Sequence, residues 1–124
     1  MSTIAKAEKA IHEIHAKLVT DKDGQHAVPD IPKSMKVGEF VHYSSDDGAG
    51  NDAGEVRIEF RDNGSPFLDL NGNMKTVITS NDPPIELSKT GNFTCRCFIT
   101  PPGAAAAIGW RVGDPLSGGN HDVQ

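Results

Sequence analysis

The alternation of apolar and polar residues predicts short β-strands along most of the chain, most clearly in Pro83–Thr100. Ile85–Ser88 alternates, Lys89–Asn92 has the composition of a turn, and the alternation then resumes. Successive side chains of a strand point to opposite faces. The second run therefore places four small or apolar side chains on one face: Phe93, Cys95, Cys97 and Ile99. We predict a β-hairpin whose second strand lies in the core.

Other segments carry the same signal. Glu55–Phe60 alternates cleanly, so Val56, Ile58 and Phe60 are expected to face inward. Residues 37–43, 67–70, 74–79 and 106–112 are further strand candidates, separated by turns such as Asn63-Gly64. About seven strands at short spacing, with no internal repeat, are typical of a single antiparallel β-sandwich.

The N-terminal segment has a different period. Its apolar residues recur at spacings of three and four: Ile4, Ala7, Ile11, Ile14 and Leu18. This pattern predicts an amphipathic helix over residues 1–20. Such a helix packs either on its own β domain or on a partner copy. The rest of the chain is then expected to be a linker with Pro29 and Pro32 over residues 21–36, a β domain over 37–112 and an irregular tail over 113–124.

Composition narrows the classes of partner. The formal charge is −5 and the chain has no run of Lys or Arg, whereas nucleic acids and anionic membranes are bound by basic surfaces. We therefore expect neither as a partner. No apolar stretch reaches the ~18 residues that span a bilayer. Residues 1–18 lack the continuous apolar region of a secretory signal, which leads us to expect a cytoplasmic protein.

Two features resemble a cupredoxin or a related immunoglobulin-like sandwich. These are Gly91-Asn92-Phe93-Thr94-Cys95 at the opening of a strand, and the upstream strand Glu55–Phe60. The resemblance covers residues 37–112 and implies a β-sandwich fold. In cupredoxins it would also imply copper held by an upstream His, the strand Cys, and a later His and often Met. Here His42 is the upstream candidate, His121 is the only His after Cys97, and no Met follows Cys97.

Cys95 and Cys97 have two interpretations, as metal ligands or as core residues. Two thiols on one face of a strand can bind copper or zinc together, with His42 and His121 as further ligands. Free cysteines are also common as small core residues. Elsewhere, no nucleophile elbow, phosphate-binding loop or dinucleotide-binding motif occurs in the sequence.

The sequence therefore predicts a non-enzymatic β-sandwich module without a cofactor, which binds a protein partner or assembles with itself. The predicted contact surface is the apolar side of the N-terminal helix: Ile4, Ala7, Ile11, Ile14 and Leu18. The alternative is a copper- or zinc-binding protein that uses Cys95, Cys97, His42 and His121.

Overall fold

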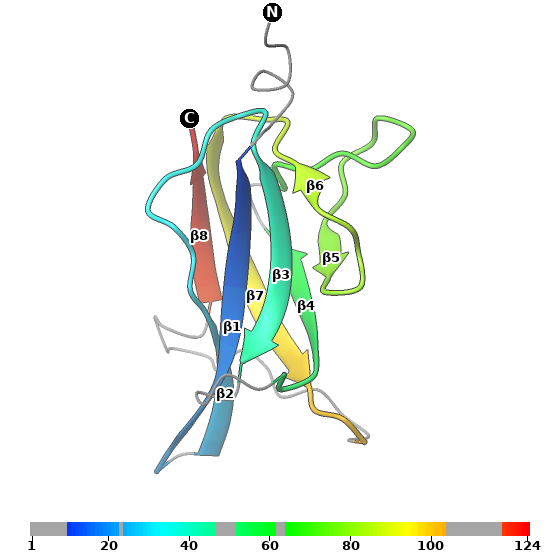
Figure 1. Ribbon diagram of the computed structural model, residues 1–124. Helices are drawn as coiled ribbons and strands as arrows, with labels where there is room; N and C mark the ends of the chain where they lie inside the picture. The colour runs from blue at the N-terminus through cyan, green and yellow to red at the C-terminus, as the bar shows by residue number, and fades with distance from the viewer. Residues whose placement is uncertain (1–9, 23, 47–51, 62–63, 104–117) are drawn as a thin grey trace, which may run out of the picture.

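The chain folds into strands and turns (Figure 1). The computed structural model describes residues 10–22, 24–46, 52–61, 64–103 and 118–124. These residues contain no helix. Their eight strands are β1 Ile11–Asp21, β2 Gly24–Pro29, β3 Phe40–Asp46, β4 Glu55–Phe60, β5 Val77–Thr79, β6 Ile85–Glu86, β7 Gly91–Thr100 and β8 Gly118–Val123. The protein is therefore mainly β, as predicted.

The strands form two sheets of four. Sheet A has the order β2-β1-β3-β6, and sheet B has the order β5-β4-β7-β8. Five of the pairings are antiparallel. The sixth is not, because β1 runs parallel to β3 with Ile11 beside Phe40 and Lys17 beside Asp46. The prediction of a wholly antiparallel arrangement is therefore wrong at the centre of sheet A.

One hydrophobic core contains side chains from both sheets. Sheet A contributes Ile14, Ala16, Val41 and Tyr43, among others, while β4 and β7 contribute alternate residues of sheet B. The inward faces predicted for these two strands are confirmed, since all seven side chains are buried: Val56, Ile58, Phe60, Phe93, Cys95, Cys97 and Ile99. Alternation places them correctly because each of these strands has one face on the core.

The predicted hairpin is wrong. β6 pairs with β3 in sheet A, whereas β7 pairs with β4 and β8 in sheet B. The segment between β6 and β7 therefore passes from one sheet to the other and does not close a hairpin. Local turn composition predicted a tight connection, but the pairing partner of each strand lies far away in the sequence.

The helix predicted over residues 1–20 is wrong from residue 11 onward, where the chain is strand β1; residues 1–9 lie outside the described part. In β1 the buried side chains follow a period of two, with Ile14 and Ala16 inward and His15 and Lys17 exposed. Pairing with β2 and β3 over nearly its whole length outweighs the weak local preference for helix.

The predicted linker and tail also contain strands. β2 occupies residues 24–29 of the segment expected to be a linker, and β8 occupies most of the described end of the tail. Glycine in β8 has a packing role, because a side chain at Gly119 would collide with Ile31. The glycine-rich segment that was expected to be irregular therefore forms strand β8, and Ile31 packs over it. The strand predicted at residues 106–112 lies outside the described residues.

A buried polar contact joins the two sheets. The Tyr43 hydroxyl of β3 lies 2.8 Å from Nε2 of His121 in β8. The His121 ring also meets Phe60 of β4 edge-on, with ring centroids 4.9 Å apart. Both polar residues are fully buried. Burial lowers the pKa of His121 from 6.5 to about 4, because the interior disfavours a charged imidazole.

We predict that this histidine makes the fold sensitive to mild acid. Between pH 6.5 and 4 the unfolded chain binds a proton at His121 that the folded protein does not, so stability falls as the pH falls through this window. The loss amounts to about 3 kcal/mol at pH 4. Chemical denaturation at a series of pH values will measure it.

The comparison variant is His121→Gln, which retains a polar side chain and cannot titrate. Its free energy of unfolding is expected to depend less steeply on pH between 6.5 and 4 than that of the wild type. The other four histidines are the same in both proteins, so their contributions cancel in the comparison. Equal slopes in the two proteins would show that His121 is not held neutral by the core.

Candidate functional site

The predicted helical contact surface does not exist in the described residues. Ile4 and Ala7 lie outside them. Ile14 is completely buried, Leu18 is partly buried against the core, and Ile11 is 58% exposed. In a strand, residue 11 faces the opposite side from residues 14 and 18. The three side chains therefore cannot bind a partner together.

The four proposed metal ligands lie on different sides of sheet A. Cys95, Cys97 and His121 are in the core. His42 is next to the inward-facing Tyr43 in β3, so its side chain points away from the core, where Nδ1 lies 2.7 Å from Glu13. Among the described residues, no group of three or more His, Cys, Asp or Glu side chains could hold a metal ion. The structure does not bring the predicted quartet together.

The surroundings of the Cys95 and Cys97 thiols disfavour the reactive thiolate form. Burial raises the pKa of Cys95 to about 12 and raises that of Cys97 further, because a thiolate would lose its hydration. The thiolate is the form that attacks disulfides and binds metals. The geometry and the pKa values together favour the interpretation of these cysteines as core residues over that as metal ligands.

Three histidines of β1 and β3 make polar contacts outside the core. His42 meets Glu13, His15 Nδ1 lies 2.9 Å from the Ser44 hydroxyl, and His12 Nε2 lies 2.9 Å from Glu39. A catalytic triad needs one histidine to contact both an orienting carboxylate and a nucleophile. Here the Glu13 carboxylate and the Ser44 hydroxyl contact different histidines, so the described residues do not assemble that machinery.

A polar pocket of about 410 Å³ lies beside β3 and is lined by His42, Ser45, Asp52 and Asn81, among others. Its side chains are engaged with the protein itself. Ser45 Oγ lies 2.7 Å from Asp52 Oδ1 and accepts the backbone N–H of Ala53, while Asn81 donates to Glu55. These contacts fix the start of β4, which favours a structural role for this pocket.

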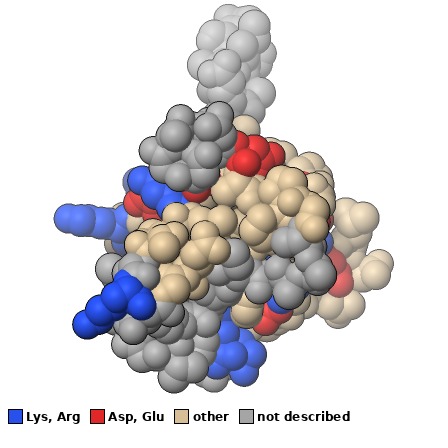
Figure 2. Space-filling view, turned by 90° about the horizontal axis from the view of Figure 1, so that it is seen from below, with Lys and Arg blue, Asp and Glu red and all other residues tan. Residues whose placement is uncertain are grey.

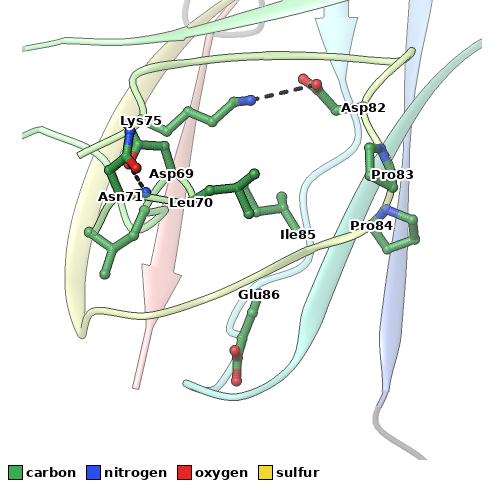
Figure 3. A pocket seen from close by; sticks show the side chains of 10 residues that line it. Asp69, Leu70, Asn71, Lys75, Asp82, Pro83, Pro84, Ile85 and Glu86 are labelled. Carbon is green, nitrogen blue, oxygen red and sulfur yellow. Dashed lines mark hydrogen bonds and ion pairs between the residues drawn. The ribbon is translucent and has the colours of Figure 1, made fainter. Parts of the chain in front are cut away.

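The larger candidate is an open pocket of about 600 Å³ beside β6 (Figure 3), which we call the β6 pocket. In Figure 1 the segment between β4 and β5 projects from the side of the molecule next to β6. The pocket lies between this segment and the residues that lead into β6. Its lining is Leu68, Asp69, Leu70, Asn71, Lys75, Asp82, Pro83, Pro84, Ile85 and Glu86.

One side of the pocket is a loop organised by Asp69. Its carboxylate Oδ1 accepts the backbone N–H groups of Asn71 and Asn73 at 2.8 and 3.0 Å. Gly72 has a φ of 82° and donates its N–H to the Asp69 carbonyl, which closes the turn. The loop holds Leu70 with its side chain fully exposed. This aliphatic side chain is thus presented on a hydrogen-bonded turn.

The other side is short, proline-rich and apolar. Pro83 and Pro84 precede Ile85, and Asp82 lies where this segment leaves the β5 turn. Lys75 reaches across from the loop to Asp82, with Nζ and Oδ1 3.5 Å apart (Figure 3). Asp82 is held in place because its Oδ2 accepts the N–H of Thr79. An ion pair therefore connects the two walls at one side of the pocket.

The pocket forms where two segments separate. Ser88, which follows β6, donates its backbone N–H to the carbonyl of Pro66, which lies between β4 and β5, at 2.8 Å. The two segments are therefore in contact at this point. After Pro66 the loop turns back on itself, and the backbone N–H of Lys75 donates to the carbonyl of Phe67. The space between Leu68 and Glu86 is left without a strand to fill it.

The rim of the pocket is acidic. It contains three carboxylates and one ammonium, and the ammonium of Lys75 is paired with Asp82. Within the described part of the chain, Asp69 and Glu86 form no ion pair. On the face seen from below in Figure 2, Lys and Arg side chains of the described residues project at separate points and form no continuous basic surface. The pocket thus combines apolar walls with a negative rim.

Sequence reasoning missed this site. It predicted a strand over residues 67–70 and a hairpin over Pro83–Thr100, without linking the two segments. The available signal was Leu70, an aliphatic residue inside a polar turn. Three of the six exposed large hydrophobic side chains of the described chain lie between residues 70 and 77: Leu70, Met74 and Val77. This concentration separates the segment from the scattered apolar residues of an ordinary surface.

None of the described residues forms a helix that is long and apolar enough to cross a membrane. No protein family, curated protein or solved structure matches this chain. The likeness to cupredoxin-like or immunoglobulin-like domains stays a prediction.

We predict that both cysteines are unreactive in the folded protein, because they are buried and protonated. With a thiol-specific chromogenic reagent at pH 8, the native protein should react only as fast as it unfolds, and both thiols should react at once in guanidinium chloride. Rapid reaction of either thiol in the native protein would contradict their placement in the core.

Proposed function

We propose that the two sheets form a β-sandwich that serves as a non-enzymatic binding module, and that the β6 pocket receives part of a protein partner. The observation that carries the proposal is the fully exposed Leu70, held on a hydrogen-bonded loop at the wall of a pocket of about 600 Å³. Pockets of this size, with mainly apolar walls and a few placed polar groups, are typical ligand sites.

The rigidity of the site supports binding. Asp69 fixes the loop that carries Leu70, and Asp82 is held by both Lys75 and the backbone of Thr79. Prolines at positions 83 and 84 restrict the backbone of the opposite wall. A preorganised surface loses less conformational entropy when a partner binds. An exposed leucine on such a surface gains most from being covered.

A non-enzymatic role also agrees with the polar chemistry of the described residues. The thiols are buried and protonated, and the histidines outside the core are divided among separate hydrogen-bonded partners. The β6 pocket itself has carboxylates, one lysine and one asparagine but no histidine, cysteine or serine. Its composition suits recognition more than nucleophilic catalysis.

We predict that Leu70→Asp weakens partner binding without unfolding the protein, since the Leu70 side chain is fully exposed in the folded protein. The probe is a library of short random peptides displayed on phage and selected on the folded protein. Enriched peptides are then synthesised, and their Kd is measured by fluorescence anisotropy. Loss of the leucine contact costs about 2 kcal/mol, which is roughly a thirtyfold rise in Kd.

The matched control is Val37→Asp, which introduces the same charge at an exposed apolar side chain outside the pocket. It should leave Kd unchanged. Peptides that bind both variants as well as the wild type, or a library that yields no binder sensitive to Leu70, would rule out the β6 pocket as the binding site.

A further inference from the structure

We infer that the β6 pocket takes an extended segment of a protein partner in which an aliphatic side chain adjoins a Lys or Arg. This inference rests on the proposed binding function and specifies the chemistry of the partner. Three properties of the pocket carry it: the apolar walls, the two rim carboxylates that form no ion pair among the described residues, and the backbone of β6 at the edge of sheet A.

The apolar walls call for an aliphatic side chain. Leu70 is exposed on one side of the opening, and the partly buried Ile85 lines the other. Pro83 and Pro84 add two exposed apolar rings on the wall formed by the approach to β6. An aliphatic side chain placed between these walls would remove apolar surface of the protein from water on both sides.

The rim calls for a positive charge beside that side chain. Asp69 and Glu86 form no ion pair among the described residues, and they lie on different segments of the lining (Figure 3). The one lysine of the rim, Lys75, forms an ion pair with Asp82. The net charge of the pocket and that of the whole chain, −5, have the same sign. A basic segment is therefore attracted to the opening, and an acidic one is repelled.

The backbone of β6 calls for an extended conformation. β6 is an edge strand of sheet A, and Leu87 donates its N–H toward β3, to the Glu39 carbonyl. Backbone groups of consecutive strand residues alternate in direction, so the N–H and C=O of Glu86 point away from β3, at the outer edge of sheet A. The C=O accepts one long hydrogen bond of 3.5 Å from the Ser88 hydroxyl and keeps a second lone pair for another donor. A bound strand can pair with these groups, as peptides do at other exposed sheet edges. Proline at 83 and 84 removes the N–H groups that would extend such pairing further.

The test uses the peptides selected from the phage-displayed random library on the wild-type protein. The inference predicts that the Leu70-dependent peptides carry a Leu, Ile or Val next to a Lys or Arg. Asp69→Asn together with Glu86→Gln keeps the hydrogen-bonding shape of the rim and removes both charges. This double variant is expected to bind roughly three- to tenfold more weakly, with a similar loss for the wild type on raising NaCl from 0.05 to 0.5 M.

Lys75→Gln provides the opposite change. It removes the positive charge of the rim and leaves Asp82 free to meet the ligand, so basic peptides should bind it more tightly than the wild type. A purely structural role of the Lys75–Asp82 pair would instead weaken binding. The two directions separate recognition from loss of structure.

The outcomes distinguish the two proposals. Peptides that depend on Leu70 but are neutral or acidic, with a Kd indifferent to salt and to the double variant, would overturn the partner class and leave the binding function standing. A library with no Leu70-dependent binder would overturn both. A mass in light scattering that rises with protein concentration and falls to that of one chain in Leu70→Asp would make a second copy the occupant and would overturn the basic partner.

Discussion

The structure depends on the packing of the two sheets through one continuous core. The inward stripe of β7 supplies Phe93, Cys95, Cys97 and Ile99, and β4 lies beside it with its own buried face. Across from them are Ile14, Val41 and Tyr43 of sheet A. Both sheets contribute apolar side chains to this core, and their removal from water is the main stabilising term of the fold. The Tyr43–His121 contact adds a directional constraint inside this core, because each polar group needs the other where water is excluded.

The β6 pocket is a consequence of how the chain leaves this core. β5 and β6 are short edge strands of different sheets, and the segments next to them meet at the bond between Ser88 and Pro66 and then separate. Hydrogen bonds from the Asp69 carboxylate keep the departing loop in a fixed shape. The core thus provides the rigid base, and the edges carry the loop with the exposed leucine, which is the proposed recognition surface. Binding sites are commonly carried in this way by loops on a stable scaffold.

Local patterns predicted the parts of the fold that depend on one strand at a time. The alternation in Glu55–Phe60 and Phe93–Thr100 gave the correct inward faces, because one side of each strand lies on the core. Pairing was beyond such reasoning. Nothing local indicates that Ile85–Glu86 belongs to a different sheet from Gly91–Thr100, since the partners β3 and β4 are distant in the sequence.

The same limit explains the N-terminal error and the missed site. Ile11, Ile14 and Leu18 fit a helical period, while Ile14, Ala16 and Leu18 fit a strand period, and only pairing with β2 and β3 decides between them. His121 lies in a glycine-rich stretch that gave no reason to expect a buried residue. The β6 pocket joins residues from two separate segments, so no single motif contains it.

The most direct test of the binding account is an NMR titration of the ¹⁵N-labelled protein with a selected peptide. The account predicts that the backbone amide signals of Leu70, Asn71, Ile85 and Glu86 shift with peptide concentration, while those of His42 and Ser44 do not. Shifts confined to β1 and β3, with the signals around Leu70 unchanged, would contradict the account and would place the interaction on the outer face of sheet A.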